Sequence, residues 1–341
     1  MKHVKFLRGL VAGLSLTTLS GLAVGAQPST VTVGSAGVIR YIEKGQPPVV
    51  IHLTVAQAQS MREAHGAHGK PGGGSTTKNL IYNGGTGGIG VETAPKIYLV
   101  FWGSQWTNND PSSEASILES FLNSVGGSSW LNTVTQYCQG VPSGTIFCNG
   151  AGTPVGNQSY MYAGYWYDNG SAAPNKPKQS QIAAEAVRAA AYFGNTGAGS
   201  NDTTQYVIAT ANGYNSGGFG TQYCAYHSYT TSSYGDIAYT NLPYITDAGT
   251  NCGANFNGLG ADAGITIVEG HEAAETMTDQ FPSTGWLDSS GSEIGDKCAW
   301  ISSGQGASAD VTFPDGLTFP VQSLWSNAFN SGSGGCVLSY S

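Results

Sequence analysis

The residues of this chain whose types and spacing suit catalysis lie in "GITIVEGHEAAETMTDQFPSTGWLDSSGSEIGDKC", from Gly264 to Cys298. Its centre, "HEAAE", matches the HExxH zinc-protease motif except that Glu275 stands where the second histidine belongs. On a helix, His271 and Glu275 lie on the same face, so both side chains can converge on one cation. Glu272 would then lie beside the ion, where a general base is needed.

Two acidic residues downstream are candidates for the remaining ligand. Glu293 and Asp296 occur in "GSEIGDKC", next to a cysteine that restrains the loop. The expected main domain, residues 78–341, holds only two histidines, His227 and His271. A site of three histidines therefore needs one from the N-terminal part of the chain. The histidines available there are His52, His65 and His68. We therefore expect the ion to be held by His271, Glu275 and either Asp296 or Glu293.

The elements that must position these residues can be predicted from hydrophobic periodicity. The segment 262–279 predicts a helix with the ionisable residues along one stripe and Ile265, Ile267 and Val268 mainly on the other side. The preceding elements alternate between the two types: strand Lys96–Gly103, helix Ser112–Gly126, strand Ser159–Asp168, helix Ser180–Gly194 and strand Gln205–Ala211. This order predicts an α/β (α+β) fold, with a mixed sheet packed with helices and a loop-rich, disulfide-bearing C-terminal part.

The N-terminus predicts export. Residues 1–26 have the charged, apolar and small-residue order of a signal peptide, and the apolar part is too short for a membrane span. Residues 27–77 predict a propeptide or N-terminal extension: a short β segment, a helix with Thr54 as N-cap and Gln57 three residues on, and a glycine-rich linker. Residues 78–341 form the main domain.

Composition favours an extracellular protein. Six cysteines permit three disulfides, and we expect neighbours to pair: 138 with 148, 224 with 252, and 298 with 336. Removal of the signal leaves 10 of the 13 basic residues against all 21 acidic residues. Such a surface repels nucleic acid, and no later segment is long and apolar enough to bind a membrane.

Several motifs in order resemble the EXORDIUM / phosphate-induced-protein family of plant extracellular proteins. They are "PKIYLVFWGSQW", "QYCAYHSY", "YTNLPYI", "NCGANF", "GITIVEGHEAAETMTD" and "GWLDSSGSEIGDKCAW", over roughly residues 95–300. The matched residues are His227, His271, Glu272, Glu275, Asp279, Glu293, Asp296, Cys224, Cys252 and Cys298. The resemblance implies an extracellular, zincin-like protein associated with growth and the cell wall, and it implies no specific enzymatic activity.

The preferred function is a secreted zincin-like metallopeptidase that acts on protein or peptide substrates. Zn²⁺ would be the catalytic ion, and Ca²⁺ is a candidate structural ion. A water on the metal would attack the scissile carbonyl while Glu272 takes its proton, and His227 or a tyrosine would stabilise the oxyanion. One histidine and two carboxylates neutralise the ion's charge, which weakens it as a Lewis acid.

The alternative is a non-catalytic extracellular or cell-wall-associated protein with a structural cation site. The numerous tyrosines and tryptophans could then stack on cell-wall polysaccharide, although we expect scattered aromatic residues to belong to the core. They include Trp102, Trp106, Trp166, Tyr162 and Tyr167. A serine hydrolase is disfavoured, because no G-x-S-x-G stands at a strand-to-helix turn with a histidine downstream of it.

Overall fold

A seven-stranded mixed sheet organises the molecule. The computed structural model describes residues 38–67 and 79–341, so the expected signal peptide and most of the glycine-rich linker, with His68, lie outside the described residues. The strand order is β1-β2-β9-β10-β8-β4-β7. The strands are β1 (Ile39–Arg40), β2 (Val49–His52), β4 (Lys96–Trp102), β7 (Tyr162–Asp168), β8 (Thr204–Thr210), β9 (Ala225–Ser232) and β10 (Gly235–Leu242).

Four neighbouring strands of this sheet are parallel, and the rest are antiparallel. Strands β10, β8, β4 and β7 run in the same direction, whereas β9 is antiparallel to β10 and β2 is antiparallel to β9. All seven residues of β8 are buried, as a continuous apolar run in the centre of a parallel sheet requires. The predicted mixed sheet packed with helices is confirmed.

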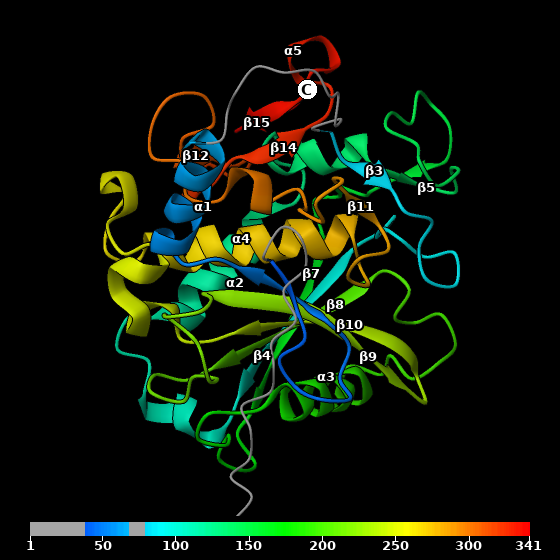
Figure 1. Ribbon diagram of the computed structural model, residues 1–341. Coiled ribbons are helices and arrows are strands. Elements are labelled where there is room, and N and C mark those ends of the chain that lie inside the picture. Colours follow the sequence, from blue (N-terminus) through cyan, green and yellow to red (C-terminus); the bar gives the residue numbers. More distant parts are fainter. Residues whose placement is uncertain (1–37, 68–78) are drawn as a thin grey trace, which may run out of the picture. The chain divides into compact units, whose positions relative to one another are not determined.

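Helices cover both faces of the sheet (Figure 1). Helix α3 (Gln179–Tyr192) packs against β8, β9 and β10 on one face. Helix α2 (Glu114–Val125) contacts β4 and β7, and α4 (Ala263–Thr278) contacts β9 and β10 on the other face. Because α4 also packs against α2 and the C-terminal strand β13, it lies between the sheet and the C-terminal part of the chain.

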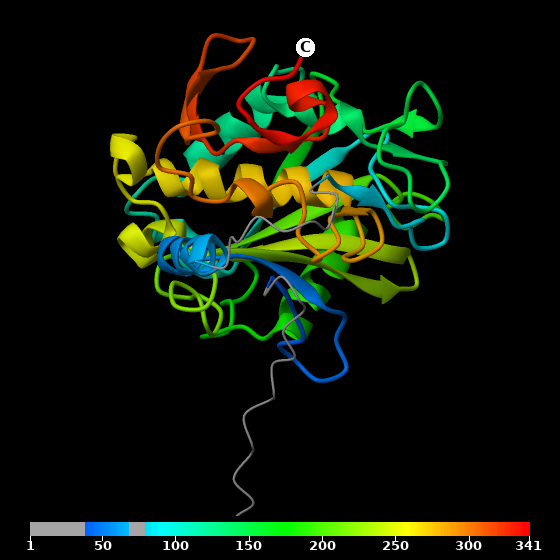
Figure 2. The same cartoon turned by 45° about the horizontal axis from the view of Figure 1, so that its top comes forward.

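The N-terminal segment 38–67 belongs to the same folded unit as the main domain. Strand β2 extends the sheet beyond β9, and α1 (Val55–Ala67) follows it and lies against the 3-10 helix η3 (Figure 2). The helix start matches the expected capping box: the Gln57 amide oxygen accepts from Thr54 N–H at 3.1 Å, and Thr54 Oγ1 accepts from Gln57 N–H at 3.4 Å. Glu43 accepts hydrogen bonds from the backbone N–H and hydroxyl of Ser180, at the first turn of α3.

Besides the seven-stranded sheet, the described residues form four two-stranded sheets and several short helices. The small sheets pair β11 (Trp286–Leu287) with β3 (Ile81–Tyr82), β12 (Ala309–Thr312) with β13 (Thr318–Val321), β14 (Leu324–Ser326) with β15 (Gly335–Val337), and β5 (Cys138–Gln139) with β6 (Thr153–Pro154). The short helices are η1 (Ser104–Asn108), η2 (Leu131–Gln136), η3 (Ile245–Cys252), η4 (Phe256–Gly258), η5 (Asp296–Cys298) and α5 (Phe329–Gly332).

Three disulfides staple these loops, and all three predicted neighbour pairings are confirmed. They join Cys138 to Cys148, Cys224 to Cys252 and Cys298 to Cys336. Within residues 38–67 and 79–341, none of the helices has the length and apolar character needed to span a membrane.

Candidate metal centre

Helix α4 carries the candidate ligands His271 and Glu275 and the candidate base Glu272, and every one of its residues is buried. Its apolar residues pack between the sheet and the C-terminal part, which fixes the rotation of the helix about its axis. The helix ends at Asp279, whose carboxylate accepts backbone N–H bonds from Ser283, Thr284 and Gly285. That carboxylate holds the turn after the helix, so Asp279 serves the fold.

The first ligand group consists of His271, Glu275 and Asp296. His271 Nε2 lies 3.0 Å from Glu275 Oε1 and 3.8 Å from Asp296 Oδ1. One donor atom from each residue lies within 4.8 Å of the other two, which is close enough for all three to bind one ion. Of the two downstream carboxylates left open by the sequence, the structure therefore brings Asp296 to His271.

The side chains of this first group are oriented by their neighbours. His271 Nδ1 lies 3.2 Å from Gln322 Oε1, and the Gln322 amide donates to Gly295 O at 2.9 Å, which fixes the amide oxygen toward the imidazole. A Cβ on Gly295 would lie 2.6 Å from His271 Nδ1 and 2.9 Å from Glu275 Oε1. Only glycine permits this close approach of the loop to the helix.

A second group surrounds His227, which strand β9 directs toward α4. His227 Nδ1 lies 3.3 Å from Glu272 Oε2 and 3.6 Å from Glu275 Oε2. Donor atoms of these three residues also lie within 4.8 Å of one another. Glu293 Oε2 lies 3.6 Å from the other ring nitrogen, Nε2. The structure thus places Glu293 beside His227 and Glu272, and does not group it with His271.

The electrostatics of both groups follow from burial. Desolvation, reinforced by neighbouring carboxylates, raises the pKa of Glu272 and of Glu293 well above its ordinary value. Desolvation also lowers the pKa of His227 to about 3 and that of His271 to about 4, so both imidazoles are neutral at pH 7. Neutral imidazole and carboxylate are the forms that bind a metal, and a cation would reverse the penalty on the carboxylates.

Several polar atoms here have no hydrogen-bond partner among the described residues. They include His227 Nε2, His271 Nε2, Glu272 Oε1, Glu275 Oε2 and both carboxylate oxygens of Glu293. Buried polar atoms in folded proteins are nearly always paired, so such a concentration marks a binding site. The ion pairs of the described residues bring only histidines to Glu272, Glu275, Glu293 and Asp296.

His52 joins the centre from the N-terminal segment. Its ring stacks on His271 with centroids 3.8 Å apart, and neither ring nitrogen has a hydrogen-bond partner in the described chain. Its donor atoms lie within ligand distance of His271 and Glu272. The sequence leaves a ligand from the extension open but does not single out His52, because pairing of β2 with β9 is not local. The side chain of His65 lies outside the described residues.

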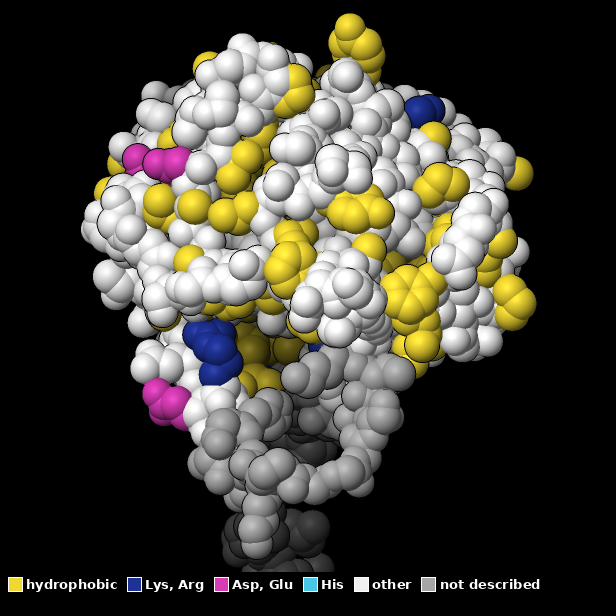
Figure 3. Space-filling view, turned by 90° about the horizontal axis from the view of Figure 1, so that it is seen from above, with side chains coloured by type: hydrophobic (Ala, Val, Ile, Leu, Met, Phe, Trp, Pro, Cys, Tyr) yellow, Lys and Arg dark blue, Asp and Glu magenta, His cyan; other side chains and the backbone are white. Residues whose placement is uncertain are grey.

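The centre is closed to solvent on nearly all sides. The side chains of both histidines and of Glu272, Glu275 and Glu293 are buried, and that of Asp296 is 3% exposed. Figure 3 shows no histidine on the face above the C-terminal hairpins. A cavity of about 280 Å³ reaches Asp296, and Leu53, Met61 and Arg62 of the N-terminal segment form part of its wall.

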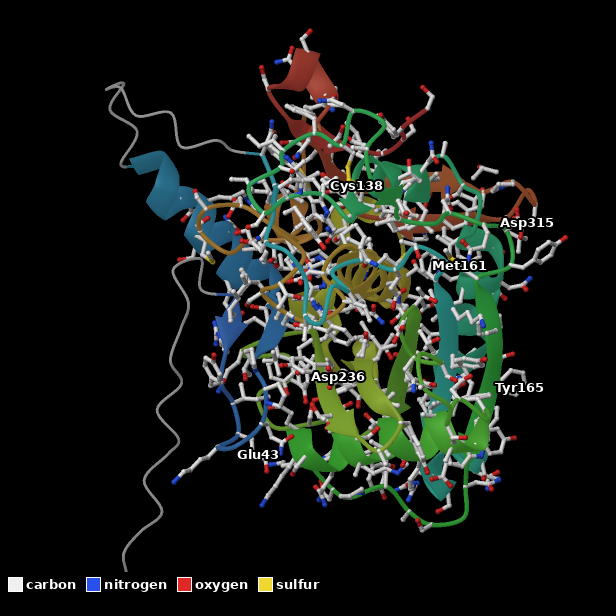
Figure 4. All side chains as sticks on the ribbon, turned by 90° about the vertical axis from the view of Figure 1, so that its right-hand side faces the viewer. Glu43, Cys138, Met161, Tyr165, Asp236 and Asp315 are labelled. Atoms are coloured by element: carbon white, nitrogen blue, oxygen red, sulfur yellow. A yellow bond between two sulfur atoms is a disulfide. The ribbon has the colours of Figure 1, made fainter. Side chains whose placement is uncertain are left out.

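The aromatic residues divide between core and surface. Trp102 and Trp106 belong to the core, as expected. Tyr165 and Tyr167 are 50% and 37% exposed on β7, which is the edge strand at the opposite end of the sheet from β1 and β2. Figure 4 labels Tyr165 on this strand. They are therefore far in strand order from the metal centre.

The chain matches no family model, no curated protein and no solved structure. Its function is therefore argued from the geometry of the centre.

Proposed function

We propose that the protein is a secreted metallohydrolase, a zincin-like metallopeptidase whose ion is held by His271, Glu275 and Asp296. The observation that carries the proposal is the convergence of these donors in a buried site where His271 Nε2 has no other hydrogen-bond partner. One imidazole nitrogen and two carboxylate oxygens fit Zn²⁺. Three disulfides fit an oxidising compartment, which supports secretion. The ordered motifs support kinship with the EXORDIUM / phosphate-induced-protein family.

The residues around the ion have distinct tasks in hydrolysis. A divalent cation in this position supplies Lewis-acid polarisation and a lowered pKa for water. Glu272 accepts the proton of the attacking water, because its carboxylate lies on the same helix face as the ligands. His227 Nδ1, 3.3 Å from Glu272 Oε2, orients that carboxylate. His227 faces the base, so orienting Glu272 is the role we favour for it over stabilising an oxyanion.

The position of β2 supports an extended peptide as substrate. Val50 of β2 pairs with His227 in the antiparallel register of β9, so a chain segment already lies along the strand that borders the centre. Release of residues 38–67 would leave β9 as a sheet edge able to bind an extended peptide by its backbone. Residues 38–67 then act as the inhibitory part of the proposed propeptide.

The test compares the intact chain with one cut between residues 68 and 78 at an inserted protease site. We expect the cut, zinc-loaded protein to hydrolyse casein or a peptide library, and the intact chain to be slow. His271→Ala in the cut protein should abolish both metal binding and hydrolysis. Metal content that is unchanged in His271→Ala would remove this site from consideration.

The second candidate is a non-catalytic extracellular or cell-wall-associated protein with a structural ion. Complete burial of the ligands favours it, because structural zinc sites are closed and catalytic sites keep an open position. One result distinguishes the two functions. If residues 38–67 stay bound after the cut and no peptide is hydrolysed, the structural function is supported.

A further inference from the structure

Each of the two carboxylate oxygens of Glu275 faces a different histidine. Oε1 lies 3.0 Å from His271 Nε2, whereas Oε2 lies 3.6 Å from His227 Nδ1. Glu275 belongs to two groups of potential ligands, one with His271 and Asp296 and the other with His227 and Glu272. A carboxylate placed in this way has the geometry of a bridge between two cations.

The two histidines also have matching surroundings. In each ring, one nitrogen faces Glu275 and the other faces an oxygen that can accept its proton. For His271 that acceptor is Gln322 Oε1, 3.2 Å from Nδ1. For His227 it is Glu293 Oε2, 3.6 Å from Nε2. The Gln322 oxygen fixes the tautomer of His271 and directs its Nε2 lone pair at Glu275 Oε1, whereas Glu293 Oε2 lies beside His227 but beyond hydrogen-bond distance.

The carboxylates of the centre can balance the charge of more than one divalent ion. When cation binding ionises all four carboxylates (Glu272, Glu275, Glu293 and Asp296), they carry four negative charges, and a single divalent ion neutralises half of them. The remaining charges would stay in a site without exposed side chains, at a high cost in free energy. Two divalent ions balance the four carboxylates.

We propose that the centre binds two divalent cations, with Glu275 as the bridging ligand. The second ion is held by His227 Nδ1, Glu272 and Glu275 Oε2, and Glu293 positions His227 from its other nitrogen. The donor set again contains one imidazole and two carboxylates, which suits Zn²⁺ or Mn²⁺. This inference rests on the ion site proposed at His271, and it makes Glu272 a ligand through one oxygen.

The test is the number of ions per chain. The intact protein is stripped with a chelator, dialysed against Zn²⁺ or Mn²⁺ and measured by elemental analysis. We expect two ions in the wild type, and one each in His227→Gln and His271→Gln. Glu269→Gln is the matched control, because Glu269 is a buried carboxyl of the same helix that belongs to neither group, and it should keep two ions.

Spectroscopy tests the bridge independently of activity. With two Mn²⁺ ions bridged by Glu275, electron paramagnetic resonance should show a spin-coupled pair. His227→Gln should replace this with the spectrum of an isolated ion. Glu293→Gln is a milder variant, which should weaken only one of the two ions, by about 10–100-fold, because it removes a positioning contact.

Each result decides between the proposals. One ion per wild-type chain overturns the second site and leaves the proposed function intact, whereas no ion overturns both. Two ions that persist in His227→Gln identify the second as adventitious and overturn this inference. Two coupled ions with no hydrolysis in the cut protein support the inference and count against the peptidase.

Discussion

Buried carboxylates are treated differently at the end of α4 and in its middle. At the end, Asp279 receives three backbone N–H bonds, and Glu114 at the start of α2 likewise receives two backbone N–H bonds and the Thr246 hydroxyl. In the middle, Glu275 accepts the Asp296 backbone N–H at Oε1, but its Oε2 receives no hydrogen bond, and neither does Glu293 in the loop that precedes η5. The fold can therefore supply donors to a buried carboxylate, and where it supplies histidines instead, an external cation is the missing partner.

Glu269 limits this argument. Both of its oxygens lack hydrogen-bond partners in the described chain, yet it belongs to neither ligand group. Burial raises the pKa of Glu269 well above its ordinary value, which favours its uncharged form. An unpaired buried carboxyl alone does not indicate a metal. The indication comes from carboxylates and imidazoles converging on shared positions.

The largest expected effect is the loss of the ions themselves. An ion that binds only the folded protein stabilises it by about 4 kcal/mol when its free concentration is 1,000 times Kd. We expect a chelator to lower the Tm of the wild type, and Glu275→Ala to have a low Tm that no longer responds to chelator or Zn²⁺. Differential scanning calorimetry with and without each additive measures both.

Glu275→His is the matched variant, because it restores HExxH without changing the helix spacing. It should keep a zinc-dependent rise in Tm, since imidazole suits zinc, but it cannot bridge two ions. A histidine variant as unresponsive to zinc as the alanine variant would show that Glu275 belongs to a hydrogen-bonded acidic cluster and is not a ligand.

The next effect is on the rate of hydrolysis. Glu272→Gln removes the proton acceptor, so kcat should fall about 10²–10⁴-fold in the cut protein. The ion at His271 should remain, because its proposed ligands are His271, Glu275 and Asp296. Peptide hydrolysis together with metal analysis measures both quantities, and Glu269→Gln again serves as control. Full activity in Glu272→Gln would rule out the proposed mechanism.

A smaller effect is expected at Asp279, the carboxylate that accepts three backbone N–H bonds. The single side-chain oxygen in Asp279→Asn cannot accept all three N–H bonds, so the free energy of unfolding should fall by about 1–3 kcal/mol. This loss should be the same with Zn²⁺ and with chelator, because Asp279 serves the turn after α4. A chelator-dependent loss, measured by urea unfolding, would mean that Asp279 takes part in ion binding.

The sequence predicts the local parts of this centre well. Spacing along one helix is a local property, so His271, Glu272 and Glu275 can be placed together from the motif alone. The buried strands β4 and β8 and the Thr54 capping box are predicted for the same reason. The neighbour pairing of cysteines is also correct, since each pair closes a short loop.

The non-local parts could not be predicted. Strands β2 and β9 are neighbours in the sheet, although β4, β7 and β8 lie between them in the sequence. No periodicity encodes that partner or its register. His52 therefore appears in the centre without a signal in the sequence. The sequence gives no prediction of strands for the β9–β10 hairpin. Because β9 carries His227, the direction of this side chain toward Glu272 and Glu275 could not be predicted either. The choice between Asp296 and Glu293 depends on the path of one loop.

Glu92 is an intermediate case between the two kinds of buried carboxylate. It is fully buried, with Oε2 accepting from the Gln205 amide at 2.9 Å and Oε1 without a partner. Burial raises the pKa of Glu92 from 4.5 to about 8, against the opposing effect of the Gln205 hydrogen bond. The folded state thus holds a proton that the unfolded chain releases near pH 4.5.

Because the folded pKa is the higher one, the stabilisation is complete below pH 4.5 and is lost as the pH rises to about 8. Within that window each pH unit costs about 1.4 kcal/mol. Glu92→Gln keeps a neutral amide in place of the protonated acid, so its unfolding free energy should fall less steeply with pH by about that amount. Urea unfolding of both proteins at pH 5, 6, 7 and 8, in chelator to empty the metal centre, isolates the difference in slope. Parallel curves would mean that Glu92 is ionised in the folded protein, and that one amide donor suffices to hold a buried carboxylate charged.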